Sequence, residues 1–389
     1  MCCLRLGLPR CVHHRISHKI RILTDTTMDN NNQNIKIIKG NEAIALAAIR
    51  YGYDGFFGYP ITPQSEILET LAVEKPWETT GMVVLQSESE LASINMVYAG
   101  GATGKCVLTS SSSPGIALMQ EGISYMAACE IPGLIVSVQR GGPGLGTIQP
   151  SQSDYFQAVY GGGNGDYHVV VLAPASVQEM ADMVGLAKEL MFRWRMPVMI
   201  LSDGAIGQMM ERCVLPPFTP RRTDAEIREQ SPWAVNGLGL RQRSHNFMSS
   251  LELDPALMED RNRKMQQKYR EIEASEVRFE EYLTFDAETV IVAYGLAARV
   301  AMGAIDQLRA EGKKVGLMRP LTLWPFPEKR LRELALQCQR MLVVEMNEGQ
   351  MVRDVKLAIE GACPVFFYGR SGGMIASPDE IVNVVKGLK

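Results

Sequence analysis

Two carboxylates, Glu88 and Glu90, follow the apolar run 82–85 at the point where a predicted buried strand leads into a predicted helix. In one interpretation Ser87 and Glu90 form a capping box, in which the serine accepts from an amide of the first helical turn and the glutamate reaches back. Acidic side chains also suit the positive end of a helix dipole. In the other interpretation one carboxylate lies at the carboxyl edge of a parallel sheet, where α/β proteins bind their ligands.

Three further loops place polar side chains after apolar strands. They cover residues 59–63, with a Pro-x-Thr-Pro pattern, 110–115, with four consecutive serines, and 139–146, with an arginine and four glycines. Each loop alone is explained by helix caps or turns. None matches the dinucleotide fingerprint, the phosphate-binding P-loop or the nucleophile elbow of serine hydrolases. Together the loops bring hydroxyl, carboxylate and guanidinium groups to one sheet edge, which favours a binding or catalytic site.

The elements that must position these loops follow from the alternation of short apolar runs with amphipathic segments. From residue 40 onward this alternation predicts an α/β fold with a parallel sheet that helices cover on both faces. The first helix, 40–53, is predicted to be capped by Asn41. The second, 62–74, is predicted to carry Pro63 in its first turn.

We expect four segments along the chain. Residues 1–34 are predicted to be a disordered tail, with Met28 as a more natural start than Met1. The other three are a first α/β domain, a linker with a long charged helix over 254–283, and a smaller second α/β domain; they cover 35–215, 216–284 and 285–389.

Composition narrows the function classes. The 389 residues carry a net charge of −3, which gives no reason to expect nucleic acid or an anionic membrane as partner. No apolar run approaches the roughly 18 residues of a membrane span. Eight cysteines lie scattered without a zinc or iron–sulfur spacing and are typical of reduced thiols in a cytoplasmic protein. The irregular cysteines and histidines between residues 2 and 18 do not predict a metal site.

Five motifs in combination resemble one family. They are GYPITPQSEI (58–67), SESELASINMVYAGGATG (87–104), LTSSSSPG (108–115), EIPGLIVSVQRGGPGLGTIQPSQSDYF (130–156) and GGGNGDY (161–167). These stretches resemble the alpha subunits of 2-oxoacid:ferredoxin oxidoreductases, most of all the branched-chain (3-methyl-2-oxobutanoate) type, and the resemblance runs from about residue 35 to 389. It implies a thiamine diphosphate enzyme that oxidatively decarboxylates a 2-oxoacid to acyl-CoA and passes the electrons to ferredoxin.

The resemblance also implies that the chain works in a complex. Its first domain would be the pyrimidine-type thiamine-binding domain, and its second would resemble the transketolase C-terminal fold. A beta subunit would hold the diphosphate and Mg²⁺, and a ferredoxin-like subunit would carry the iron–sulfur clusters. A gamma subunit, ferredoxin and coenzyme A as cosubstrate complete the expected partners. The sequence agrees in lacking both a GDG…N diphosphate motif and a cysteine cluster.

Specific roles come from the same resemblance. Glu90, chosen over Glu88 from its spacing to Gly104 and to the serine loop, is expected to stabilise the reactive tautomer of the cofactor ring through the ring nitrogen N1′. Thr62 and Arg140 are expected to meet the substrate, the arginine pairing with its carboxylate. Two short segments are expected to line the cofactor ring. One consists of Tyr59, Pro60 and Ile61, and the other is the serine loop with Ser111, Ser112 and Ser113.

Other functions remain open from the residues. The same fold serves non-redox thiamine enzymes, and 2-oxoglutarate is the alternative substrate to a branched-chain 2-oxoacid. A non-catalytic α/β module is a reading of a different class. The convergence of a hydroxyl, a carboxylate and an arginine on one edge argues against such a module.

Overall fold

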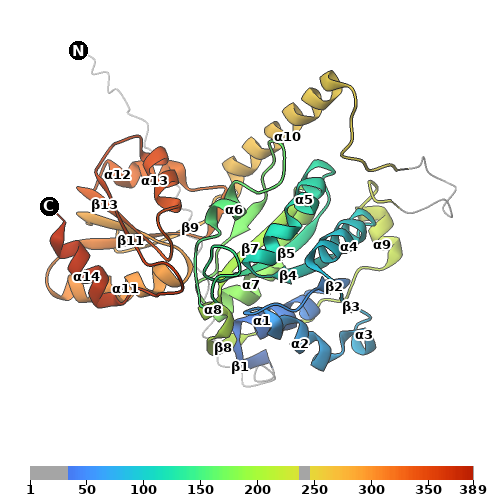
Figure 1. The fold of residues 1–389 in the computed structure, drawn as a ribbon, viewed down its shortest axis with the longest axis horizontal. Helices are drawn as coiled ribbons and strands as arrows, with labels where there is room; N and C mark the ends of the chain where they lie inside the picture. Colours follow the sequence, from blue (N-terminus) through green and yellow to red (C-terminus); the bar gives the residue numbers. More distant parts are fainter. Residues whose placement is uncertain (1–33, 236–245, 389) are drawn as a thin grey trace, which may run out of the picture. The chain divides into compact units, whose positions relative to one another are not determined.

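The computed structural model describes residues 34–235 and 246–388, which belong to one compact unit (Figure 1). The metal-like cysteines and histidines near the N-terminus and the predicted tail up to residue 33 lie outside the described residues. Asn34 is described, and it accepts from Arg50 Nη1 at 3.1 Å and from the Leu215 amide at 2.8 Å.

A seven-stranded sheet forms the larger lobe, with the order β12-β6-β7-β5-β4-β2-β3. Six neighbouring strands are parallel, and only β12 runs antiparallel, against β6. The strands are β2 (Gly55–Gly58), β3 (Val83–Gln86), β4 (Val107–Ser111), β5 (Gly133–Gln139), β6 (Val170–Leu172), β7 (Pro197–Asp203) and β12 (Thr322–Trp324). The predicted parallel α/β fold is confirmed.

Helices cover both faces of this sheet, as its apolar central strands require. Contacts place α1, α2 and α7 together on one face, and α4 and α5 together on the other (Figure 1). The helices of this lobe are α1 (Gly40–Arg50), α2 (Ser65–Glu74), α3 (Pro76–Thr79), α4 (Glu90–Ala102), α5 (Ser113–Ala128), α6 (Tyr155–Val159), α7 (Val177–Arg193), α8 (Gly204–Gln208) and α9 (Asp224–Gln230). A two-stranded antiparallel ribbon pairs β1 (Ile35–Lys39) with β8 (Met210–Val214).

The strand order reverses direction between β2 and β4. From β2 the chain passes outward to β3, and then crosses back over to β4 on the other side of β2. In open parallel sheets a ligand crevice forms outside the carboxyl ends of the strands at such a reversal. The loop after Gly58 and the loop after Ser111 therefore flank the expected position of a ligand.

A second sheet, of order β14-β13-β10-β11-β9, forms the smaller lobe, and only β9 is antiparallel in it. Its strands are β9 (Phe279–Tyr282), β10 (Thr289–Val292), β11 (Val315–Pro320), β13 (Arg340–Glu345) and β14 (Val365–Gly369). Contacts pair α11 with α14 and α12 with α13. These helices and the connecting α10 are α10 (Pro255–Ser275), α11 (Gly295–Ala310), α12 (Glu328–Ala335), α13 (Met351–Ile359) and α14 (Pro378–Gly387).

Two segments link the lobes in ways that the sequence pattern did not indicate. The charged helix predicted over 254–283 ends at Ser275, and the remaining residues form β9 of the smaller sheet. β12 leaves the smaller lobe to pair with β6, where the Trp324 ring stacks on His168 at a centroid distance of 4.7 Å. The predicted domain limits stay a prediction.

Three predicted helix starts are wrong. Lys39 occupies the N-cap position of α1 without a side-chain cap. Asn41 lies buried inside the helix and donates from Nδ2 to the Pro63 carbonyl at 2.7 Å. α2 begins at Ser65, two residues after the proline. The cap of α4 is Ser89, whose hydroxyl accepts from the Ala92 amide at 3.3 Å, so the capping box on Ser87 does not form. In each case a tertiary contact or burial outweighs the local pattern.

The cysteines of the described residues are free thiols. Cys106, Cys129 and Cys213 are buried free thiols, whereas Cys338 and Cys363 are half-buried, with their sulfurs 4.0 Å apart. Within the residues that the structure describes, no helix has the length and apolar character needed to cross a membrane.

Asp203→Asn is expected to remove a pH dependence from the stability of the chain. Burial raises the pKa of this carboxyl to about 6, although the amides of Ala205 and Ile206 donate to it at 2.9 and 3.1 Å. An unfolded aspartate titrates near 3.9, so the folded state holds this proton more tightly. The stabilisation from Asp203 is therefore complete below about pH 4 and is lost as pH rises through about 6.

Thermal melts of the chain and of Asp203→Asn at pH 5 and pH 8 test this. The wild type should lose about 1.4 kcal/mol more than the variant between the two pH values, because this interval covers only the last pKa unit of the shift, from pH 5 to the folded pKa of about 6. Asp254→Asn, at the exposed cap of α10, is the matched control. Parallel pH curves for the wild type and Asp203→Asn would contradict the prediction.

Candidate active site

Glu90 is a buried carboxylate at the first position of α4. Its side chain is 6% exposed, whereas Glu88 two residues earlier is exposed. Within residues 34–235 and 246–388, no hydrogen bond or ion pair to the Glu90 carboxylate is formed. The N-terminus of a helix favours a negative charge through its dipole, which stabilises the carboxylate in this position. Glu90 is thus held in place while its oxygens stay available to a donor from outside this part of the chain.

Gly115 in α5 brings the Glu90 carboxylate against the serine loop. A Cβ atom at Gly115 would lie 2.5 Å from Glu90 Oε1 and 2.0 Å from Ser111 Oγ, so only a glycine fits between them. We call Glu90, Ser111 and Gly115 the carboxylate cluster. Beside it, the hydroxyl of Ser112 is buried and has no hydrogen-bond partner among the described residues.

The loop after β2 is anchored from below by polar side chains. Gln64 links it to the serine loop, because its Nε2 donates to the Tyr59 carbonyl at 2.9 Å and its Oε1 accepts from Ser110 Oγ at 2.6 Å. The Pro63 carbonyl accepts from Asn41 Nδ2 at 2.7 Å and from Gln208 Nε2 at 3.1 Å. These bonds fix the backbone on which the predicted contact residues stand. Of these, Tyr59, Pro60 and Thr62 are exposed and Ile61 is half-buried.

Arg140 reaches this loop from the end of β5. Its side chain is only 8% exposed, and Nη1 donates to the Thr62 carbonyl at 3.0 Å. Its Nε is buried without a partner, and no carboxylate of the described residues forms an ion pair with its guanidinium. An arginine held in this way keeps N–H groups that suit the carboxylate of a small substrate.

Asp154 completes this second group, and sequence reasoning missed it. Ser113 Oγ donates to Asp154 Oδ2 and accepts from the Arg140 amide at 3.0 Å. Burial raises the pKa of Asp154 to about 6, while the Ser113 hydroxyl and the Arg140 charge act against this shift. We call Thr62, Arg140, Ser113 and Asp154 the arginine cluster. The only sequence signal for Asp154 was its position in SQSDYF, at the end of a motif that resembles the family.

The two clusters share the turn that joins β4 to α5. Ser111 belongs to the carboxylate cluster and Ser113 to the arginine cluster, so a single residue, Ser112, lies between them. No hydrogen bond joins Glu90 directly to Thr62 or Arg140 within the described ranges. The structure therefore brings the predicted substrate residues together and places the predicted cofactor carboxylate beside them, with the turn between the two groups.

A cavity of about 670 Å³ opens beside the arginine cluster. It is lined from three sides, by the start of α5 at Ser113 and Pro114, by the glycine loop 142–144, and by Asp154 together with polar residues of the smaller lobe. No lysine or arginine of the described residues lines it. A space of this size holds a small organic molecule.

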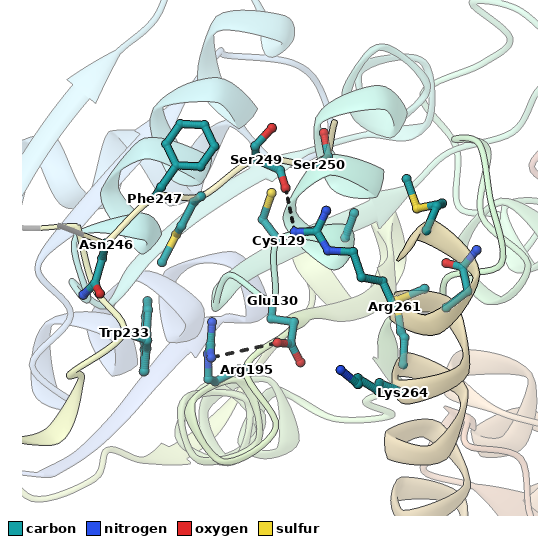
Figure 2. Close-up of a pocket in the computed structure, with 15 residues that line it drawn as sticks. Cys129, Glu130, Arg195, Trp233, Asn246, Phe247, Ser249, Ser250, Arg261 and Lys264 are labelled. Atoms are coloured by element: carbon teal, nitrogen blue, oxygen red, sulfur yellow. Dashed lines mark hydrogen bonds and ion pairs between the residues drawn. The ribbon is translucent and has the colours of Figure 1, made fainter. Parts of the chain in front are cut away.

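Another pocket, of about 460 Å³, lies at the far end of α5 (Figure 2). Its walls include Cys129, which follows the last residue of α5, and Figure 2 shows Arg195 turned towards Glu130, 3.9 Å away. The sixteen residues of α5 separate this pocket from Ser113 by on the order of 24 Å. The pocket lies at the amino ends of the parallel strands, and active sites of parallel α/β folds lie at the carboxyl ends.

The two clusters fit one half of a thiamine diphosphate site. The free carboxylate of Glu90 and the orphaned hydroxyl of Ser112 are acceptors and donors suited to a polar heteroaromatic ring. Among the described residues no group of three or more histidine, cysteine or acidic side chains is placed to hold a metal ion.

Comparison with known families agrees with this geometry. Residues 46–274 match the family described as pyruvate flavodoxin/ferredoxin oxidoreductase, thiamine diphosphate-binding. Residues 287–381 match pyruvate:ferredoxin oxidoreductase core domain II.

Individual proteins extend the similarity over nearly the whole chain. The ketoisovalerate oxidoreductase subunit VorB of Methanothermobacter marburgensis is 47% identical, covering 91% of this chain and 97% of its own. The 2-oxoglutarate synthase subunit KorA of Archaeoglobus fulgidus is 35% identical, covering 91% of this chain and 99% of its own.

Solved structures show the same relationship. A 2-oxoglutarate:ferredoxin oxidoreductase from Magnetococcus marinus, solved with 2-oxoglutarate, coenzyme A and succinyl-CoA bound, superposes with a TM-score of 0.78 at 30% identity over 91% of this chain. The present chain spans 65% of that relative's length. A split-gene transketolase shares only the fold, with a TM-score of 0.56 at 15% identity over 90% of this chain and 98% of its own.

Proposed function

Because the chain belongs to the thiamine diphosphate-dependent 2-oxoacid:ferredoxin oxidoreductases, we propose that it holds the aminopyrimidine half of the cofactor in a complex acting on a branched-chain 2-oxoacid. The reaction is the oxidative decarboxylation of 3-methyl-2-oxobutanoate to its acyl-CoA, with two electrons passed to ferredoxin. The 47% identity to a ketoisovalerate oxidoreductase subunit supports this substrate over 2-oxoglutarate, whose synthase subunits reach 35%.

The observation that carries the proposal is the buried, unshared carboxylate of Glu90 at the strand-order reversal. Thiamine diphosphate, when bound, supplies the carbanion that attacks the 2-oxo carbon. Glu90 accepts a hydrogen bond from the ring nitrogen N1′ and stabilises the proton there. A charge-assisted bond of this kind in a water-poor site is stronger than the same bond in water.

The arginine cluster binds the other reactant. Arg140 uses its remaining guanidinium N–H groups for the carboxylate of the 2-oxoacid, and the exposed hydroxyl of Thr62 meets the ketone end. Tyr59, Pro60 and Ile61 form one wall of the ring pocket and the serine loop forms the other. The assignment of these residues rests on their place in the family-like motifs and on the bonds that hold their loops.

Partner chains supply what the described residues lack. A beta subunit provides the ligands of the diphosphate and Mg²⁺, and a ferredoxin-like subunit carries the iron–sulfur clusters that pass electrons on to ferredoxin. A gamma subunit completes the complex, and coenzyme A is the acyl acceptor. We place this assembly in the cytoplasm, where thiols such as Cys106 and Cys213 stay reduced.

Substrate choice is tested with the assembled complex. Viologen reduction, with coenzyme A present, is measured against a panel of 2-oxoacids that includes 3-methyl-2-oxobutanoate, 2-oxoglutarate and pyruvate. The proposal expects kcat/KM to be highest for the branched-chain acid. A preference for 2-oxoglutarate would assign the chain to the alternative substrate, and no turnover of any 2-oxoacid would overturn the function itself.

The isolated chain is expected not to bind thiamine diphosphate tightly. The diphosphate and its metal ion provide much of the electrostatic attraction of such a cofactor, and no metal site is present among the described residues. Calorimetric titration of the chain alone with thiamine diphosphate and Mg²⁺ tests this, with the assembled complex as the positive control. Micromolar binding by the isolated chain would contradict the division of the cofactor site between two subunits.

A further inference from the structure

Asp154 occupies the cap position of α6 but does not cap it. Aspartate at this position ordinarily accepts from the amides of the first helical turn. Here the side chain makes no such bond, and its carboxylate instead receives the hydroxyl of Ser113. The carboxylate thus forgoes a local hydrogen bond for a contact with a residue 41 positions away in sequence.

Ser113 connects this carboxylate to Arg140. Its hydroxyl has two acceptors within reach, the Asp154 carboxylate and, at 3.2 Å, the Arg140 carbonyl, and the charged carboxylate is the closer and stronger of the two. The lone pairs of the hydroxyl accept the Arg140 amide at 3.0 Å. With the proton donated to Asp154, the serine satisfies both neighbours, and the carboxylate favours this arrangement over donation to the Arg140 carbonyl. The Arg140 backbone, from which the guanidinium extends to Thr62, is paired with Pro150, and Ser113 adds a contact to its amide.

The backbone that carries Asp154 is fixed from both lobes. Its amide donates to Gln139 Oε1 at 3.0 Å, next to Arg140 in the chain. From the smaller lobe, Gln350 donates through Nε2 to the Ser153 carbonyl at 2.6 Å and accepts the Phe156 amide at 2.8 Å. These bonds fix the backbone of Asp154, from which the carboxylate reaches the hydroxyl of Ser113.

We propose that Asp154 is a positioning residue for substrate binding, which acts through Ser113 to hold Arg140 in place for the carboxylate of the 2-oxoacid. The proposal rests on the function proposed above. Asp154 forms no ion pair with Arg140, although its carboxylate lies close enough to feel the arginine charge. This separation matters because a direct ion pair would occupy the guanidinium N–H groups that the substrate needs.

A purely structural role predicts different behaviour. If Asp154 only held α6, its loss would reduce thermal stability and the amount of intact complex, and the affinity for the 2-oxoacid would stay the same in what remains. A positioning role predicts a selective rise in the KM of the 2-oxoacid, with the KM of coenzyme A unchanged. Asparagine, which offers a carbonyl oxygen to Ser113, should restore most of the affinity that alanine loses.

The test is a double-mutant cycle in the assembled complex with Asp154→Ala, Ser113→Ala and the double variant. Each single variant should raise the KM for 3-methyl-2-oxobutanoate about ten-fold, and the double variant should raise it no further, because both changes break one chain of hydrogen bonds. Asp154→Asn should stay within about three-fold of the wild type, as expected when the bond to Ser113 is kept. Asp254→Ala, which removes an aspartate from the exposed cap of α10, is the matched control and should leave both KM values unchanged.

A wild-type complex that turns over 2-oxoacids while Asp154→Ala keeps a normal KM would overturn the inference and leave the proposed function intact. Full additivity of the two single changes would also overturn it, because the residues would then act separately. If Asp154→Ala does not assemble, Ser113→Ala breaks the same link from the other side, and an unchanged KM in that variant counts against the inference. A wild-type complex without activity on any 2-oxoacid would reject the function first.

Discussion

Glu90→Gln is expected to leave a folded, assembled complex that has lost most of its turnover. The amide can still hydrogen-bond to the cofactor ring, but it lacks the negative charge that stabilises the proton at N1′. Removing one well-placed electrostatic contact typically costs about 10²–10³ in rate. Turnover of the branched-chain 2-oxoacid and the thermal midpoint are measured together, so that a catalytic loss is separated from unfolding.

Glu88→Gln is the matched control for this change. Glu88 is exposed and lies two positions before Glu90 in the chain. The same substitution there should leave turnover within about two-fold of the wild type, as is usual for surface positions. An active Glu90→Gln would remove this residue from the mechanism. A dead Glu88→Gln beside it would transfer the role to the earlier carboxylate.

Gly115→Ala is expected to reduce turnover nearly as strongly, although the alanine touches neither substrate nor cofactor. Its Cβ would meet Ser111 Oγ at 2.0 Å and Glu90 Oε1 at 2.5 Å, distances at which the carboxylate must move. A displacement of about 1 Å at a reacting group costs on the order of 10²-fold in rate. The complex should also lose about 1–3 kcal/mol of stability, as is usual when a packed site is overfilled.

Gly303→Ala separates this effect from the general consequence of adding a methyl group to a helix. Gly303 lies in α11, and a Cβ there would make only ordinary contacts, 3.5 and 3.8 Å from Pro378. This control should keep full turnover and gain up to about 1 kcal/mol of stability, since alanine is the better helix former. Gly115→Ala with normal turnover would show that the Glu90 position is not critical.

The parallel fold was predictable because each of its elements has a local sequence signal. Strands such as β5 and β7 are continuous apolar runs, and a parallel arrangement gathers the loops that follow them on one edge. The choice between Glu88 and Glu90 was harder, because the local pattern around both fits a helix start. Burial of Glu90 against Gly115 distinguishes the two, and that contact joins two different helices. The role of Glu90 towards the cofactor stays a prediction.

Contacts between distant residues could not be predicted in this way. Asn41 looked like a helix cap, yet a carbonyl 22 residues along the chain holds its side chain inside the protein. The importance of Asp154 depends on Ser113 and on the smaller lobe, and neither is near it in sequence. A single sequence records helix and strand preferences through neighbouring residues, whereas such contacts depend on how the whole chain is folded.

The pairing of β12 with β6 means that the larger sheet is completed late in synthesis of the chain. During synthesis the ribosome completes β2 to β7 before it reaches Thr322–Trp324, so β6 has one unpaired side while more than a hundred residues are added. Exposed strand edges readily pair with other chains. A nascent chain halted between α10 and β11 therefore presents a sheet in which β6 is an unpaired edge strand. Ribosome stalling in this interval would favour aggregation or chaperone capture, and stalling after Trp324 has left the ribosome would not.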